Sequence, residues 1–255
     1  MAPLVEMKDV SIAFGGIQAV DNVSITLNAG EVVGLLGHNG AGKSTLIKML
    51  SGAYKMDSGE IWINGERAHI ASPRDARDFN IETIYQTLAL ADNLDAASNL
   101  FLGRELTTSM GFVDDDRMEA ETRKIMAKLN PNFRKLKEPV SALSGGQRQS
   151  VAIARAVYFG AKILILDEPT SALGVRQTSN VLATIDRVRK QGVGVVFISH
   201  NVRHALAVGD RFTVLNRGKT LGTATRGEIT PEELQDMMAG GQEMAQLEGS
   251  LGGTV

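Results

Sequence analysis

The first part of the chain alternates between short apolar and polar runs. Over residues 6–27 these runs are interrupted at Phe14-Gly15-Gly16 and again at Asp21-Asn22. Alternation with breaks of this kind is typical of antiparallel strands joined by turns. The pattern therefore predicts an antiparallel β layer at the start of the protein.

Three later runs are apolar without alternation. They cover residues 31–37, 163–167 and 194–199. Short runs of this kind are typical of strands that are buried on both faces of a parallel sheet. Helical patterns lie between them, at residues 44–51, 147–159 and 177–189. Strands that alternate with helices predict an α/β fold with a mostly parallel core sheet.

A long stretch between two of these runs has a different character. Residues 91–140 contain no buried-strand pattern, whereas 114–129 are polar and favour a helix that begins with acidic residues. We therefore expect a helical subdomain at about 91–160, inserted into an α/β domain of residues 1–240. A strand at 212–215 and a helix from Pro231 complete this domain, and the Gly-rich segment 241–255 is expected to be a flexible tail.

Composition narrows the classes of function. With 255 residues, 43% of them hydrophobic, the chain can bury a sizeable core. It has no cysteine, which excludes disulfides, thiol nucleophiles and Cys-ligated metals, and we expect an intracellular protein. The net charge of −2 argues against a nucleic-acid partner. We also expect neither a secretory signal nor a membrane span.

The strongest motif is a glycine-rich segment that follows the first buried run. It reads Gly37-His38-Asn39-Gly40-Ala41-Gly42-Lys43-Ser44 and matches the phosphate-binding loop of nucleotide-binding proteins. Its glycines allow the main chain to wrap closely around a polyphosphate. Lys43 is expected to reach the β and γ phosphates, and Ser44 to ligate Mg²⁺. The alternative is a glycine-rich turn with a chance lysine, but chance seldom produces the whole pattern in this context.

Two carboxylates follow the apolar run at 163–166. Asp167 ends a predicted parallel strand, where ligands collect, and is expected to hold the magnesium. Glu168 is then placed to orient or deprotonate a water that attacks the γ-phosphoryl group. The alternative is a pair of acids that cap the turn at Pro169-Thr170, but the phosphate loop earlier in the chain argues against it.

A second glycine motif lies before the predicted helix at 147–159. Leu143-Ser144-Gly145-Gly146-Gln147 can form an anion-binding nest, with Ser144 as an added donor. This segment resembles the signature of ATP-binding-cassette (ABC) ATPases. The resemblance implies a P-loop NTPase fold with a mostly parallel core sheet, an antiparallel β layer and a helical subdomain. It also implies that the signature of one subunit closes over the ATP held by a second ABC ATPase subunit, as in a homodimer.

The same resemblance gives roles to single positions. Phe14 corresponds to the aromatic residue that stacks on adenine, and Gln86 to the glutamine that senses Mg²⁺ and the attacking water. His200 corresponds to the histidine that contacts the γ-phosphate. The alternative for Phe14 is a phenylalanine of the core, and the alternative for Gln86 is a solvent-facing glutamine in a loop. The expected nucleotide-binding residues are Phe14, Gly37, His38, Asn39, Gly40, Ala41, Gly42, Lys43, Ser44, Thr45, Ser144, Gly145, Gly146 and Gln147; the expected metal ligands are Ser44, Gln86 and Asp167; the expected catalytic residues are Glu168, His200 and Gln86.

Three positions stand apart from these assignments. His69 and His204 are expected to be surface residues without a role. In the loop 171–174, which the resemblance places across the dimer interface, Gly174 stands where the family frequently has aspartate. This departure removes a possible carboxylate contact with the partner.

Segments 71–77 and 99–105 resemble those of monosaccharide-importer ATPases, and fructose importers are the nearest group. The resemblance implies ATP hydrolysis that energises sugar import through a separate integral membrane permease, with a periplasmic or extracellular sugar-binding protein as an indirect partner. The protein would sit peripherally on the cytoplasmic face of the membrane. Alternative substrates are ribose-like or xylose-like sugars, or another class such as amino acids. Alternative functions are a soluble ABC ATPase that acts on nucleic acid or ribosomes, and a P-loop kinase. A kinase would leave the motif at 143–147 without a purpose.

Overall fold

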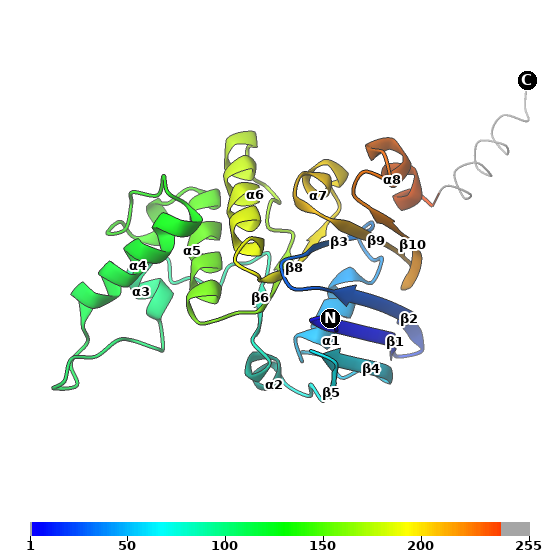
Figure 1. The fold of residues 1–255 in the computed structure, drawn as a ribbon, viewed down its shortest axis with the longest axis horizontal. Coiled ribbons are helices and arrows are strands. Elements are labelled where there is room, and N and C mark those ends of the chain that lie inside the picture. The colour runs from blue at the N-terminus through cyan, green and yellow to red at the C-terminus, as the bar shows by residue number, and fades with distance from the viewer. Residues whose placement is uncertain (1, 241–255) are drawn as a thin grey trace, which may run out of the picture.

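The computed structural model describes residues 2–240, so the predicted tail at 241–255 lies outside the described residues. Two sheets form one part of the molecule, and a group of helices extends from it (Figure 1). This arrangement confirms the α/β fold with an antiparallel layer and helical elements.

The antiparallel layer is a four-stranded sheet in the order β2-β1-β4-β5. Its strands are β1 (Val5–Phe14), β2 (Ile17–Leu27), β4 (Ser58–Ile63) and β5 (Glu66–Ala68). The break expected at Asp21-Asn22 is wrong, because β2 continues through both residues. The register with β1 shifts there, and Asn22 adopts a φ of 49°, a left-handed conformation that asparagine tolerates better than most residues.

The core sheet has six strands in the order β10-β9-β3-β8-β7-β6. All neighbours are parallel except β9 and β10. The strands are β3 (Val32–Leu36), β6 (Ile81–Ile84), β7 (Ile163–Asp167), β8 (Gly194–Ser199), β9 (Arg211–Asn216) and β10 (Lys219–Thr225). The predicted mostly parallel sheet is confirmed.

Both faces of this sheet are apolar. Val32 and Leu36 of β3 pack into one buried cluster, and Val33 and Leu35 pack into the other. This explains why the runs in the sequence do not alternate. Since β3, β7 and β8 are parallel, their carboxyl ends meet at one edge, where ligands of such sheets bind.

Three helices form a group at one end of the molecule (Figure 1). Helices α3, α4 and α5 contact one another away from the antiparallel sheet, and all three lie within the predicted insertion at 91–160. Their bounds are Ala96–Phe101, Asp115–Leu129 and Gly145–Tyr158, with a 3₁₀ turn at Val140–Ala142. The remaining helices are α1 (Lys43–Leu50), α2 (Pro73–Asp78), α6 (Val175–Arg189), α7 (Val202–Val208) and α8 (Pro231–Met238). None of the helices within 2–240 is long and apolar enough to cross a membrane.

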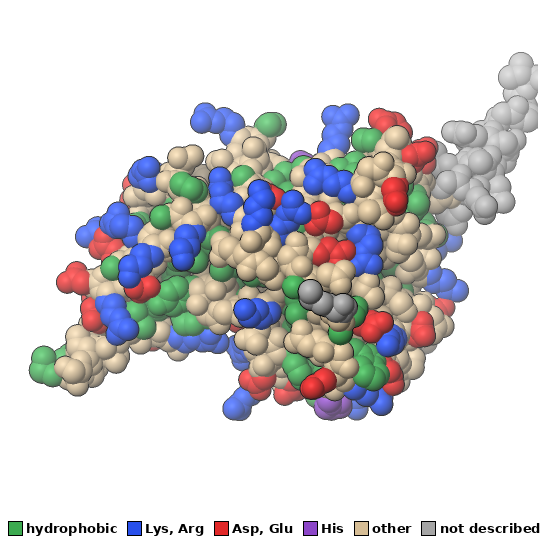
Figure 2. All heavy atoms as spheres, viewed as in Figure 1, with side chains coloured by type: hydrophobic (Ala, Val, Ile, Leu, Met, Phe, Trp, Pro, Cys, Tyr) green, Lys and Arg blue, Asp and Glu red, His purple; other side chains and the backbone are tan. Residues whose placement is uncertain are grey.

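A loop at 102–114 projects from the helical end, between α3 and α4 (Figure 1). A backbone hydrogen bond of 2.8 Å from Thr108 to Phe112 closes its tip. Met110 and Phe112 are 79% and 69% exposed. Figure 2 shows hydrophobic side chains at the end of this loop. The tip of this loop is therefore an exposed apolar projection.

Candidate functional site

The phosphate loop connects β3 to α1, and its glycines are required by the backbone. Gly37 and Gly42 have φ angles of 148° and 100°. A Cβ at Gly37 would lie 2.4 Å from the carbonyl oxygen of Leu215, and one at Gly42 would lie 2.7 Å from that of Ala19. No side chain among the described residues caps α1, so its first amides remain available to an anion.

Lys43 begins α1 and is buried, with 7% of its surface exposed. Its Nζ donates hydrogen bonds to the carbonyl oxygens of Gly37 at 2.6 Å and His38 at 3.0 Å. Burial lowers the pKa of Lys43, while the carboxylates of Glu168 and Asp167 act to raise it. The ammonium group is thus held against the loop and next to both predicted acids.

Asp167 ends β7 and faces the start of α1. Burial raises the pKa of its carboxyl group, as does the charge of Glu168, whereas Lys43 opposes this shift. The Ser44 side chain, like Lys43, acts to lower the pKa of Asp167. A hydroxyl and a carboxylate are oxygen ligands of the kind that Mg²⁺ prefers, and two neighbouring acids favour a cation between them. The residues present therefore fit a magnesium ion.

Glu168 and His200 meet at the carboxyl edge of the core sheet. His200 follows β8, and its Nδ1 lies 2.8 Å from Oε1 of Glu168. Glu168 has a φ of 51°, in the left-handed region that costs a non-glycine residue roughly 1 kcal/mol or more. Backbone strain of this kind persists only where the surroundings hold it, and it is common at active sites.

A cavity of about 520 Å³ brings most of the predicted residues together. Its walls include the phosphate loop at 39–45, Gln86 and both acids. The Gln86 amide also donates to the Ser171 hydroxyl at 3.4 Å, which is a long hydrogen bond. Residues that the sequence analysis missed also line the cavity: Ile17, Gln18, Ala19, Arg217 and Gly218. The first three follow Phe14 closely in the chain, so the segment after Phe14 was the available signal.

Phe14 does not line this cavity, judged over the described part of the chain. Its ring is 44% exposed and packs edge-on against Tyr54, with 5.2 Å between the ring centroids. The alternative of a buried core phenylalanine is therefore wrong. Phe14 is a partly exposed aromatic residue shortly before the cavity wall at 17–19 in the chain.

The signature motif lies apart from the phosphate loop. Ser144 and Gln147 cap α5 reciprocally: the Ser144 hydroxyl accepts from the Gln147 amide at 3.3 Å, and the Gln147 side chain accepts from the Ser144 amide at 2.9 Å. The hydroxyl proton of Ser144 is not used in this pair. A Cβ at Gly146 would come within 3.1 Å of the carbonyl oxygen of Gln177, so this glycine also allows α5 to approach α6. Within residues 2–240, no residue of the signature motif lines the cavity beside the phosphate loop.

The other histidines differ from one another. His38 is exposed and contributes its carbonyl oxygen to Lys43, and His69 is exposed as expected. The expectation that His204 is a simple surface residue is wrong. Its ring is partly buried, because α7 packs on the core sheet, and Nδ1 lies 3.0 Å from the hydroxyl of Thr170.

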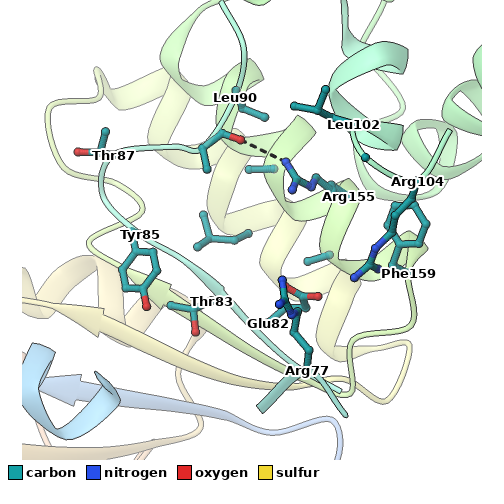
Figure 3. A pocket seen from close by; sticks show the side chains of 15 residues that line it. Arg77, Glu82, Thr83, Tyr85, Thr87, Leu90, Leu102, Arg104, Arg155 and Phe159 are labelled. Carbon is teal, nitrogen blue, oxygen red and sulfur yellow. Dashed lines mark hydrogen bonds between the residues drawn. The ribbon is translucent and has the colours of Figure 1, made fainter. Parts of the chain in front are cut away.

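A second cavity, of about 300 Å³, opens between β6 and α5 (Figure 3). Tyr85 and Thr87, the neighbours of Gln86, line it. The opposite wall carries Arg104, which lies 4.6 Å over the ring of Phe159, and Arg155, which donates to the carbonyl of Ala89 at 3.2 Å. We call this cavity the groove. It places arginines and apolar side chains directly beside the chain segment that enters the first cavity.

Two sugar import ATP-binding proteins are similar to this chain in sequence. Xylose/arabinose import ATP-binding protein XylG of Sulfolobus acidocaldarius is 45% identical over 238 residues, which are 93% of this chain and 94% of that protein. Ribose import ATP-binding protein RbsA 2 of Escherichia coli O157:H7 is 40% identical over 93% of this chain. The chain spans about half the length of that ribose protein, 47%. Neither relative is named for fructose, so the likeness to fructose importers stays a prediction.

The structure and the family comparison agree with these relatives. A crystal structure of an ATP-binding cassette of an ABC transporter in its ADP conformation superposes with a TM-score of 0.80, covering 94% of this chain and 96% of that one. At 23% identity, this likeness shows the fold. Residues 20–171 match the family described as "ABC transporter". The resemblance drawn from the motifs is confirmed, and the chain belongs to the ABC transporter family.

Proposed function

We propose that this chain is the ATP-hydrolysing subunit that energises import of a monosaccharide through a separate membrane permease. The observation that carries the proposal is the contact between Glu168 and His200, next to a phosphate loop. The names of the two relatives support a pentose such as xylose, arabinose or ribose.

Binding of ATP follows from the first cavity. The free amides of α1 and the Lys43 ammonium would hold the phosphates, because both present positive charge to the same space. Phe14 would stack on the adenine through its exposed ring. Ser44 and Asp167, with Gln86, would hold Mg²⁺, which neutralises phosphate charge and orients the γ-phosphoryl group when it is bound.

Hydrolysis would depend on Glu168 and His200. Glu168 accepts a proton from a water whose oxygen attacks the γ-phosphorus in line, while the bond from that phosphorus to the bridging oxygen breaks. The products are ADP and inorganic phosphate. His200 would orient the Glu168 carboxylate through their 2.8 Å contact. Its other ring nitrogen would contact the γ-phosphate of bound ATP.

A second cassette would complete each site. Ser144, Gly145 and Gly146 do not line the cavity of their own phosphate loop. Among the described residues the Ser144 hydroxyl accepts a hydrogen bond and its proton has no acceptor. These groups would close over ATP held by a partner subunit, in a homodimer or a heterodimer. Closure then assembles the site, and hydrolysis opens it again.

The groove is the proposed contact with the permease. It borders Gln86 through Tyr85 and Thr87, so a permease segment seated there would sense the state of the nucleotide. The protein would then sit peripherally on the cytoplasmic face of the membrane. A periplasmic or extracellular sugar-binding protein would deliver the sugar to the other side.

The test reconstitutes the chain with the permease that co-purifies with it, in lipid vesicles. ATP hydrolysis is measured with and without a binding protein loaded with xylose, arabinose, ribose or fructose. The proposal expects stimulation by at least one loaded binding protein and none by the sugar-free form. If no monosaccharide raises the rate, the assignment to sugar import is wrong, even where the chain hydrolyses ATP.

A further inference from the structure

A hydrogen-bonded link lies directly behind the pair of Glu168 and His200. Thr170 is two residues beyond Glu168 and is 4% exposed. Its hydroxyl oxygen lies 3.0 Å from Nδ1 of His204, on α7. The turn that carries Glu168 is thereby tied to a helix that begins just after His200.

The same histidine contacts the residue that follows His200. Asn201 caps α7: its side-chain oxygen accepts from the His204 amide at 3.1 Å. Its Nδ2 faces Nε2 of the His204 ring at 3.5 Å. One imidazole therefore touches the two loops that carry the catalytic pair.

The chemistry of these contacts favours one form of the ring. An amide nitrogen can only donate, so Nε2 of His204 acts as an acceptor toward Asn201 and Nδ1 carries the hydrogen toward Thr170. Burial lowers the pKa of His204, and the nearby His200 acts in the same direction. The ring is thus a neutral bridge between a hydroxyl and an amide.

The turn at 168–172 needs such support. Both Glu168 and Ala172 have positive φ angles, 51° and 58°. The backbone holds the turn through two hydrogen bonds, from Glu168 N to the Ile198 carbonyl at 3.1 Å and from Ser171 N to the Glu168 carbonyl at 3.0 Å. The Thr170 side chain adds the one side-chain link from this turn to α7 that the structure describes.

We infer that His204 is a positioning residue for ATP hydrolysis. It bridges Thr170 and Asn201 and so holds the Glu168 carboxylate within 2.8 Å of His200. This inference rests on the proposed hydrolytic role of Glu168. It gives a purpose to a histidine that touches neither the phosphate loop nor the cavity beside it.

The kinetic test compares His204→Leu with His204→Asn in the full chain. Leucine fills the space without a polar atom, whereas the asparagine side chain places a donor near the position of Nδ1. We expect His204→Leu to lower kcat by about ten- to a hundredfold, in the range seen when a residue that supports a catalytic group is lost. The affinity for ATP should stay within about twofold, because the ring does not contact the phosphate loop. His204→Asn should restore most of the turnover.

Two further variants separate positioning from stability. Thr170→Val removes only the hydroxyl. Combined with His204→Leu it should lower kcat no further, because both substitutions break the same hydrogen bond between Thr170 and His204. Arg203→Leu, an exposed neighbour on α7, is the matched control and should be as active as the parent. If His204→Leu keeps its turnover, or if a folded His204→Asn loses as much as leucine does, the inference is wrong.

A spectroscopic measurement tests the inference without turnover. The ring nitrogen signals of His200 are assigned by NMR with the help of His200→Gln. In His204→Leu they should move toward those of a free imidazole, because the contact with Glu168 loosens. Unchanged signals would overturn the inference. A parent chain that does not hydrolyse ATP would instead overturn the proposed function and leave this measurement valid.

Discussion

Nδ1 of His200 lies 2.8 Å from Oε1 of Glu168, although the two residues are 32 positions apart in the chain. The parallel pairing of β7 and β8 produces this contact, because each residue directly follows one of these neighbouring strands. The contact therefore results from the sheet topology. Substitutions of Glu168 or His200 should affect catalysis more than folding.

Glu168→Gln should retain ATP binding and lose hydrolysis by about a hundredfold or more, since the amide cannot accept the proton of the attacking water. With ATP and Mg²⁺, size-exclusion chromatography should show a stable dimer of the variant. Glu66→Gln, on the exposed part of β5, is the control. Turnover at the parent rate would remove Glu168 from the mechanism.

Lys43→Ala should weaken ATP binding by about tenfold or more, because a buried phosphate-facing charge is lost. Titration calorimetry with ATP measures the change. Lys55→Ala removes a charge from the exposed surface and should leave the affinity unchanged. Equal affinities of the two variants would contradict the role of Lys43.

Asp167→Asn should stabilise the free protein while it abolishes magnesium-dependent hydrolysis. The pKa of Asp167 is raised in the folded state, chiefly by burial, so ionising this group costs folding free energy. The cost is absent below the unfolded pKa, about 3.9, grows as the pH rises and is complete above the folded pKa. Urea unfolding should thus show a gain near neutral pH and little gain in acid. Two results would contradict this origin of the gain. One is an equal gain in unfolding free energy at every pH, and the other is the same gain in the exposed variant Asp78→Asn.

Gly174→Asp should stabilise the chain by about 0.5 kcal/mol. Gly174 caps α6 without a side-chain hydrogen bond, its φ is −70°, and a Cβ there would meet nothing within 4 Å. Urea unfolding measures the effect. Gly160→Asp has equal space but a φ of +86°, so the same substitution should destabilise the chain there. Gains at both positions would show that added charge, and not the cap, is responsible.

Asn99→Leu should destabilise the fold by about 2–4 kcal/mol. The Asn99 side chain is fully buried, accepts from the Ala91 amide at 2.6 Å and donates to the carbonyl oxygens of Ala91, Leu94 and Asp95. Leucine would leave the Ala91 amide without its partner. Each of the three carbonyl oxygens would lose one of its two hydrogen bonds and keep the one from a backbone amide. Asn180→Leu, on the exposed face of α6, should change the unfolding free energy little, and a similar cost at both sites would argue against the buried network.

The sequence predicted the parts of the site that depend on local chain geometry. The phosphate loop, Asp167 and Glu168 follow buried apolar runs whose pattern survives in the structure as β3 and β7. The short strands β4 and β5 were not predicted, because they are polar on one side and are held by pairing, β4 with β1 and β5 with β4. His204 was misjudged for a related reason. Only tertiary packing brings α7 to Thr170, and no spacing in the sequence records that contact.

Residues 85–87 border two cavities at once, since Gln86 lines the one beside the phosphate loop while Tyr85 and Thr87 line the groove. Thermodynamic linkage then imposes an equality on any molecule that occupies the groove and shifts this tripeptide. If the groove ligand changes the affinity for ATP by some factor, ATP changes the affinity for the groove ligand by the same factor. A weak groove ligand whose dissociation constant is indifferent to saturating nucleotide would show that the shared segment transmits nothing.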